Sequence, residues 1–204
     1  MRAGQPLSGL KIRLLLNEKV SYQWARSDAN GLYSVSVPAG RYVVTGYEPD
    51  SEIANELLSG MIMYPEQHGA GQLSEPMPVM PGKPGVGLDF NYAAPVVLIE
   101  PVGVVAGNGK VVASWEEYPG AAAYRLPLEE RQSERKFEST IFLPTESRPP
   151  QVTTNSVDLS TIGVKLKPGN FYILHIEALD KSGVPISKTA DSYRRRGFVT
   201  SAAN

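Results

Sequence analysis

Residues 27–42 read Ser-Asp-Ala-Asn-Gly-Leu-Tyr-Ser-Val-Ser-Val-Pro-Ala-Gly-Arg-Tyr. The carboxylate of Asp28 is suited to accept hydrogen bonds from turn amides, Asn30 tolerates a left-handed backbone, and Gly31 adopts a positive φ without strain. We therefore predict that the chain reverses here and continues as a hairpin, with Asp28 and Gly31 as structural residues of the turn.

The residues after this turn alternate between apolar and polar side chains. Tyr33, Val35 and Val37 are separated by serines, and a period of two places the three apolar side chains on one face of a β-strand. Pro38-Ala-Gly40 then predicts a second turn. The pattern predicts an all-β protein, in which Tyr33 has a structural role.

The composition argues against several classes of protein. A formal net charge of −1 supplies no electropositive surface for phosphates, so nucleic acid is not an expected partner. The chain has no run of 18 apolar residues, and its first residues, Met-Arg-Ala-Gly-Gln-Pro, lack an apolar signal core, so we expect neither a membrane span nor a signal peptide in this sequence. The absence of cysteine excludes disulfides and thiolate metal sites.

The run Glu129–Lys136 mixes both signs of charge and is predicted to be a solvated strand edge.

The length of 204 residues suits two domains of about 100 residues each. Ala93-Ala-Pro95 has the composition of a tight linker, so we predict two β-sandwiches at residues 1–94 and 95–204. Residues 52–58 are predicted to form one or two helical turns, and the polar, proline-rich residues 144–155 a surface loop. The predicted strands cover residues 10–16, 41–47, 76–80 and 86–92, then 96–100, 110–116, 122–130 and 170–179.

The first half carries Gly4-Gln-Pro-Leu-Ser-Gly-Leu-Lys-Ile-Arg-Leu14, then Ser27-Asp-Ala-Asn-Gly-Leu-Tyr33 and Val37-Pro-Ala-Gly-Arg-Tyr42. This pattern resembles the carboxypeptidase regulatory-like (transthyretin-like, prealbumin-like) β-sandwich over residues 3–92. The resemblance implies a module without catalytic groups that accompanies enzymes, surface proteins or transporters. Residues 50–62 depart from it, because they form a longer and more helix-like connection than the family has.

The second half carries Val111-Val-Ala-Ser-Trp115 and Leu166-Lys-Pro-Gly-Asn-Phe-Tyr172. These segments resemble a fibronectin type III domain over residues 95–200. The resemblance implies that Trp115 is the core tryptophan and that Tyr172 forms a tyrosine corner, in which its hydroxyl hydrogen-bonds to the upstream backbone. Pro127 departs from this pattern in the third strand, where a missing N–H weakens the ladder, so we expect a bulge or a break there.

Groups that carry catalysis or bind metals are sparse. Asp28 and Asn30 have the oxygen spacing that begins a calcium loop, but no glutamate follows where such a loop closes and the turn alone accounts for both residues. His68 and His175 are remote from each other in the sequence, so we predict solvated imidazoles and no metal site. No Gly-x-Ser-x-Gly motif occurs, and we predict no enzyme and no cofactor.

Aromatic side chains provide the sharpest ligand hypothesis. Tyr22 and Trp24 share one face of a strand, and Tyr47 and Tyr64 lie in neighbouring segments. Exposed rings stack on the C–H faces of sugars, so these four residues form a candidate ligand-binding platform. The alternative is that the rings cover one sheet of the sandwich or a contact between the two domains.

The two resemblances together imply a non-catalytic β-sandwich module of the bacterial cell envelope or the extracellular space. Such a module acts as a structural spacer or as a protein-binding or adhesion unit. The alternative is a carbohydrate-binding protein of a glycan-capturing system. The expected partner is a protein or polysaccharide at the cell surface, the expected location is extracytoplasmic (periplasm, cell surface or secreted), and the expected state is a monomer. These functional expectations rest on analogy between folds.

Overall fold

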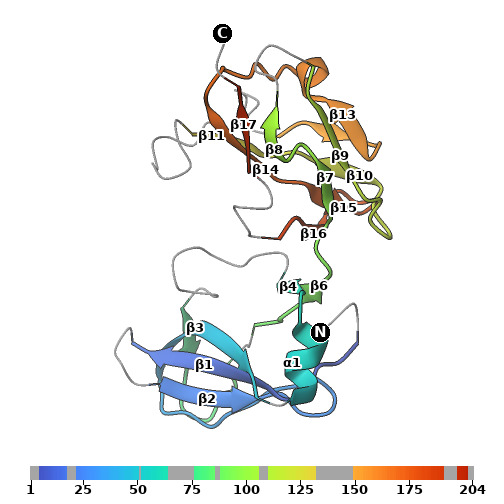
Figure 1. Cartoon of the computed structure of the whole chain (residues 1–204). Helices are drawn as coiled ribbons and strands as arrows, with labels where there is room; N and C mark the ends of the chain where they lie inside the picture. Colours follow the sequence, from blue (N-terminus) through green and yellow to red (C-terminus); the bar gives the residue numbers. More distant parts are fainter. Residues whose placement is uncertain are drawn as a thin grey trace. The chain divides into compact units, whose positions relative to one another are not determined.

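The computed structural model describes residues 5–17, 22–50, 52–63, 76–85, 88–105, 110–131, 149–190 and 197–201. The chain divides into two compact units, Met1–Ala94 and Pro95–Asn204 (Figure 1). Strands dominate the described part of both units, which contains only two short helices: α1 (Glu52–Leu58) and the 3₁₀ helix η1 (Leu159–Ile162). The predicted all-β class is confirmed. Neither helix has the length and apolar character needed to cross a membrane.

The first unit is built on a four-stranded antiparallel sheet in the order β2-β1-β3-β5. Its strands are β1 (Leu10–Leu16), β2 (Tyr22–Arg26), β3 (Gly40–Pro49) and β5 (Met77–Val79). Two short strands, β4 (Ile62–Met63) and β6 (Tyr92–Ala93), form a second antiparallel pair. Helix α1 lies within the segment that the sequence predicted to be helical, so that prediction is confirmed.

The alternation along β1 determines which face of this sheet is covered. Leu10, Ile12 and Leu14 are buried, whereas the intervening Lys11 and Arg13 lie on the opposite face. The other buried members of this core are Leu7, Ala25, Tyr42, Val44, Ala54, Phe90 and Tyr92. Because burial of each aliphatic side chain stabilises the fold by roughly 1.5–3 kcal/mol, Leu10, Ile12 and Leu14 are a main reason that this face of the sheet packs against the rest of the core.

Two strand predictions in the first unit are wrong. Residues 33–37 form no ladder, and their β-pairing is limited to one bridge between Ser27 and Tyr33. Of the predicted strand 86–92, only Tyr92 lies in a strand; residues 88–91 do not, and residues 86–87 lie outside the described part. An alternating pattern sets the faces that side chains occupy, but it does not place a partner backbone within hydrogen-bond distance.

The second unit has a three-stranded sheet in the order β13-β9-β7 and a larger sheet that is interrupted midway. The three-stranded sheet comprises β7 (Leu98–Glu100), β9 (Val112–Trp115) and β13 (Ser156–Asp158). One half of the larger sheet runs β12-β10-β15-β16, formed by Gln151–Val152, Ala123–Arg125, Glu177–Leu179 and Pro185–Lys188. The other half runs β11-β14-β17-β8, formed by Leu128–Arg131, Phe171–Leu174, Gly197–Thr200 and Gly103–Val105. Two sheets that enclose one core make this unit an immunoglobulin-like β-sandwich.

The interruption of the larger sheet lies at Pro127. This proline separates β10 from β11, and the neighbouring strand is interrupted between β14 and β15. Pro127 has no N–H to donate, but its carbonyl accepts a hydrogen bond of 2.8 Å from the backbone N–H of His175. The break predicted at Pro127 is therefore confirmed.

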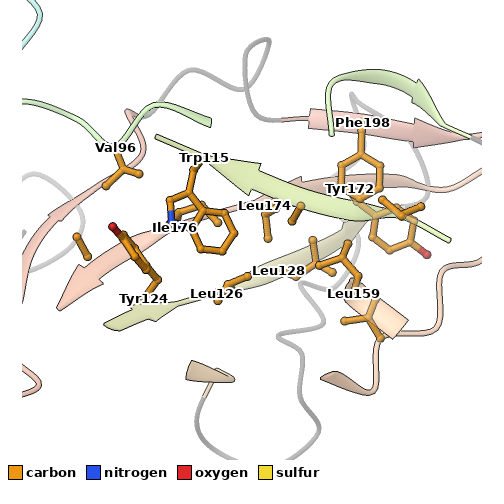
Figure 2. Packing of buried hydrophobic residues seen from close by; sticks show 14 residues of the cluster. Val96, Trp115, Tyr124, Leu126, Leu128, Leu159, Tyr172, Leu174, Ile176 and Phe198 are labelled. Carbon is orange, nitrogen blue, oxygen red and sulfur yellow. The ribbon is translucent and has the colours of Figure 1, made fainter. Parts of the chain in front are cut away.

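The core of the second unit is centred on aromatic and branched side chains from both sheets (Figure 2). The ring of Trp115 meets that of Tyr124 edge to face, with centroids 5.2 Å apart. The ring of Tyr172 stacks on that of Phe198 at 5.4 Å. Leu174 and Ile176 are both fully buried, because residues two positions apart lie on the same face and the alternation continues across the break between their strands.

One loop prediction in this unit is also wrong. Gln151–Val152, within the predicted loop 144–155, forms β12 and pairs with β10, with Val152 opposite Tyr124. Val152 packs against the core, which stabilises this short edge strand despite its polar and proline-rich surroundings. Residues 144–148 lie outside the described part.

Candidate functional site

The turn at Asp28 is closed by its own side chain. Asp28 Oδ1 accepts hydrogen bonds from the backbone N–H groups of Asn30 and Leu32, each at 2.9 Å, and Gly31 has a φ of 71°. A second turn is closed in the same way: Asp180 Oδ1 accepts hydrogen bonds from the backbone N–H groups of Ser182 and Val184, which are also two and four residues further along the chain. Among the described residues, no group of three or more His, Asp or Glu side chains is placed to hold a metal ion.

Tyr33 links two segments that the sheet leaves unpaired. Its hydroxyl donates to the carbonyl of Leu88 at 2.8 Å and accepts from the N–H of the same residue at 2.7 Å. Burial raises the pKa of Tyr33, although the bond from Leu88 acts in the opposite direction. Tyr33 therefore replaces part of a missing ladder with two side-chain bonds.

Trp24 lies on the outward face of β2 and is 40% exposed. The Nζ of Lys11 lies 4.2 Å from its ring centroid, in a cation–π contact, and also forms an ion pair of 3.0 Å with Glu48. Tyr22 belongs to the same strand, but its side chain lies outside the described part, as does all of Tyr64. Trp24 is thus the one member of the predicted aromatic platform whose ring the structure describes on this outer face.

Tyr47 lies on the other face of the sheet. It pairs with Ile12, which faces the core, whereas Trp24 pairs with Arg13, which faces outward. Its ring contacts Phe90 at 5.6 Å and Tyr92 at 5.3 Å, edge to face in both cases. The structure therefore does not bring Trp24 and Tyr47 together, because the register between the strands places them on opposite faces.

Tyr47 instead borders a cleft beside α1 with a volume of about 590 Å³. The residues around this cleft are Tyr47, Pro49, Glu52, Asn55, Glu56, Leu58, Ser59, Met61 and Tyr92. Tyr92 is only 3% exposed, and its hydroxyl has no hydrogen-bond partner in the described part of the chain. Burial, reinforced by the neighbouring Tyr47, raises the pKa of Tyr92, so its phenol stays protonated.

Sequence reasoning missed this cleft, although one of its features was readable. Glu52 and Glu56 are four residues apart in a predicted helix, which places both carboxylates on one face. The approach of Tyr47 and Tyr92 to that face has no comparable local signal, because they come from different, distant strands.

The tyrosine corner of the second unit includes a buried carboxylate. The hydroxyl of Tyr172 accepts a hydrogen bond from the backbone N–H of Lys167 at 2.7 Å and donates to Glu130 Oε1 at 2.8 Å. Glu130 also accepts from the Nζ of Lys167 at 3.0 Å and from Asn170 Nδ2 at 2.7 Å. Burial raises the pKa of Glu130, but these hydrogen bonds and the charge of Lys167 outweigh it, so the net pKa is lowered. Burial also raises the pKa of Tyr172 to about 12, and Glu130 adds to this effect.

The charged residues beside this corner are less solvated than the sequence predicted. Glu130 and Arg131 are both buried, which corrects the prediction of a solvated edge at the start of the run 129–136. His175 is also mostly buried, and its Nε2 lies 3.3 Å from Glu129 Oε1, which corrects the prediction of a solvated imidazole. Arg131 pairs with the same carboxylate at 2.7 Å. The partners of these charges, His175, Lys167 and Asn170, come from a segment distant in the chain, which the pattern of a single strand does not reveal.

The outer face of the three-stranded sheet carries exposed branched side chains. Val97 and Ile99 alternate with the inward Leu98, and Val112 lies on the same side of the neighbouring β9; each of these outward side chains is about half exposed. We call Val97, Ile99 and Val112 the outer apolar face. Exposed apolar residues gathered on neighbouring strands are typical of surfaces that contact another protein.

The second unit is a β-sandwich of the immunoglobulin-like class and the first unit is built on an antiparallel sheet, so the protein belongs to the all-β class. No protein-family model matches the chain, and no curated protein matches it. Among solved structures, it is similar to the crystal structure of the chicken CNTN1 FN1–FN3 domains, with a TM-score of 0.24 and 11% sequence identity. The match covers 90% of this chain, which spans 55% of the CNTN1 chain.

Proposed function

We propose that this protein is a non-catalytic module of the cell envelope or extracellular space that acts as a spacer or as a protein-binding unit. The observation that carries the proposal is the outer apolar face, which offers Val97, Ile99 and Val112 to a partner from a rigid sheet. The acidic side chains described above also serve structural purposes: Asp28 and Asp180 close turns. The extracytoplasmic location and the identification of residues 1–94 as a carboxypeptidase regulatory-like sandwich belong to the proposal and rest on the sequence resemblance.

The test is the binding of fluorescently labelled full-length chain to intact bacterial cells and purified cell walls, before and after protease treatment of the cells. We expect protease-sensitive binding that falls at least tenfold in a Val97→Lys/Ile99→Lys variant. Val184→Lys is the matched control, because Val184 is similarly exposed but belongs to the turn between β15 and β16. Binding that survives both the protease and the double substitution would contradict a protein partner at this face.

A second candidate function, glycan capture, is favoured by the exposed ring of Trp24. An outward tryptophan on a sheet surface offers a flat apolar area for a sugar ring, although Lys11 contacts this ring. A polysaccharide and glycan screen tests it with Trp24→Ala and Tyr22→Ala, and with Trp24→Phe as the control that keeps an aromatic ring. Loss of a glycan signal in Trp24→Ala but not in Trp24→Phe supports capture, whereas equal binding by all three variants removes this face as the site.

A further inference from the structure

We propose that a groove beside residues 33–37 binds an extended peptide segment of a partner protein, which pairs with residues 34–37 as an added β-strand. The groove lies in the first unit and has a volume of about 430 Å³. This inference goes beyond the proposed function, because it concerns the other unit and does not depend on the outer apolar face.

Residues 34–37 have the sequence pattern of a strand but no backbone partner. Apolar and polar side chains alternate from Tyr33 to Val37, yet the only β-pairing of this stretch among the described residues is the bridge between Tyr33 and Ser27. Within the same part of the chain, the N–H and C=O groups of residues 34–37 form no hydrogen bond. A row of unpaired backbone groups is a template on which a strand from another chain can pair.

The groove supplies contacts for the side chains of such a strand. Its apolar lining comes from two segments of the first unit and includes Tyr33, Val35, Val37, Met77, Val79 and Met80. Val35 is 38% exposed and Met80 is 60% exposed, so both present apolar surface to a ligand. When a peptide is recognised by strand addition, backbone hydrogen bonds supply affinity and the lining receives alternate side chains. We therefore expect apolar residues at alternate positions of the peptide.

Strand β5 also borders the groove, but it is a poorer template than residues 34–37. It is the last strand in the order β2-β1-β3-β5, so its outer edge has no partner strand in the described part of the chain. Pro78 stands at its centre and has no N–H, and a proline in an edge strand hinders the extension of a sheet. The added strand is therefore assigned to residues 34–37.

Lys83 sets the charge expected of the peptide. It is the only charged residue that borders the groove, it is exposed, and it has no ion-pair partner among the described residues. An ammonium group favours a nearby carboxylate, so we expect an Asp or Glu side chain in the peptide. Because exposed ion pairs contribute little free energy, this contact adjusts the choice of sequence and the backbone pairing supplies most of the affinity.

The experiment is amide hydrogen exchange of the ¹⁵N-labelled full-length chain, followed by NMR. In the free chain, the amides of residues 34–37 should exchange much faster than those of the neighbouring ladder strand β3, because no acceptor protects them. The probes are acetylated and amidated heptapeptides with Val, Leu, Ile or Phe at alternate positions, Thr or Ser between them, and Glu at one end.

A bound peptide should protect every second amide of the segment. Only alternate residues of a strand direct their backbone groups to one edge, so exchange should slow at least tenfold at Ser34 and Ser36 or at Val35 and Val37, but not at all four. Two copies of the best peptide, N-methylated at its odd or at its even positions, keep the side chains but lose the donors of one edge. One copy should lose binding, and the other should keep it.

Variants of the chain separate this groove from general adhesion of apolar peptides. Val35→Lys and Met80→Lys each place a charge on an exposed lining residue and should weaken binding at least fivefold. Leu32→Lys is the matched control, because Leu32 is 68% exposed in the same unit but does not border the groove; it should change the affinity less than twofold. Lys83→Gln should weaken binding of peptides that end in Glu and leave binding of those that end in Gln unchanged.

Several results would each overturn the inference. Strong protection of the amides of residues 34–37 in the free chain would show that this backbone already has a partner. Absence of binding by every peptide of the panel would exclude the groove as a strand-binding site. Binding by both N-methylated copies, or an equal loss in the groove variants and in Leu32→Lys, would show that the peptides adhere without forming an added strand.

Discussion

The tyrosine corner of the second unit permits a quantitative prediction for Tyr172→Phe. This substitution keeps the ring in the core but removes two hydrogen bonds, one from the N–H of Lys167 and one to the carboxylate of Glu130. A bond between neutral groups contributes about 0.5–1.5 kcal/mol and a bond to an ionised group about 1.5–3 kcal/mol. We therefore expect the free energy of unfolding of this unit to fall by about 2–4 kcal/mol at neutral pH.

The assay is urea denaturation of the full-length chain in a Trp24→Phe background. The chain has two tryptophans, one in each unit, so the fluorescence of the fully buried Trp115 then reports only the second unit. Tyr124→Phe is the matched control, because the Tyr124 hydroxyl accepts from the N–H of Tyr118 at 2.8 Å in the same unit. This control loses a bond between neutral groups and should cost about 0.5–1.5 kcal/mol.

The pH dependence tests the role of Glu130 directly. Its folded pKa is lowered below the ordinary value of 4.5, so its contribution is fully present above that value and is lost as the pH falls through the folded pKa. The stability difference between wild type and Tyr172→Phe should therefore be large at neutral pH and shrink well below pH 4.5. A loss in Tyr172→Phe no greater than that in Tyr124→Phe, or a difference that does not change with pH, would refute this reasoning.

Further substitutions test three features of the chain by thermal denaturation monitored by circular dichroism. Tyr92→Phe is expected to leave the first unit as stable or to stabilise it by about 1 kcal/mol, because it deletes a buried hydroxyl without a partner among the described residues; a clear loss of stability would show that the hydroxyl is bonded. Gly31→Ala should lower the free energy of unfolding by about 1–2 kcal/mol because of its φ of 71°, and by more because the added Cβ would lie only 3.1 Å from a backbone nitrogen. Gly82→Ala, with a φ of 68° and no atom within 4 Å of the added Cβ, should lose only the contribution from the positive φ. Equal losses in the two variants would mean that the close approach at Gly31 has no effect. Asp28→Ala and Asp180→Ala should each destabilise their own unit by about 1–2 kcal/mol, because each exposes two turn amides that lose their acceptor; unchanged melting of both variants would show that the two turns form without this side chain.

Much of the architecture was predictable because its causes are local. The turn at Asp28 depends on bonds that span two and four residues, and the faces of β1 follow from a period of two. The break at Pro127 follows from one missing N–H, which no tertiary contact restores. The strand expected over residues 33–37 was not predictable in the same way, because a ladder needs a partner backbone from elsewhere in the chain.

The candidate sites also depended partly on local pattern and partly on tertiary contacts. The sequence pattern placed Tyr22 and Trp24 on one face of their strand, because side chains alternate with a fixed period, but it left open whether that face was exposed or covered. The exposure of Trp24 came from the structure. The assignment of Tyr47 to the opposite face and the burial of Glu130 required the register between strands, which one strand's pattern does not contain.

Composition and short-range pattern thus determined the all-β class, the turns and the faces of individual strands, because these depend on backbone and side-chain chemistry within a few residues. Only the tertiary structure decided where the cleft lies. Its carboxylates come from α1, whereas Tyr47 and Tyr92 come from strands on either side of that helix in the chain. The unpartnered hydroxyl of Tyr92 and the charge beside it arise only when these distant segments meet, since a shared cleft is a property of packed surfaces rather than of any one segment.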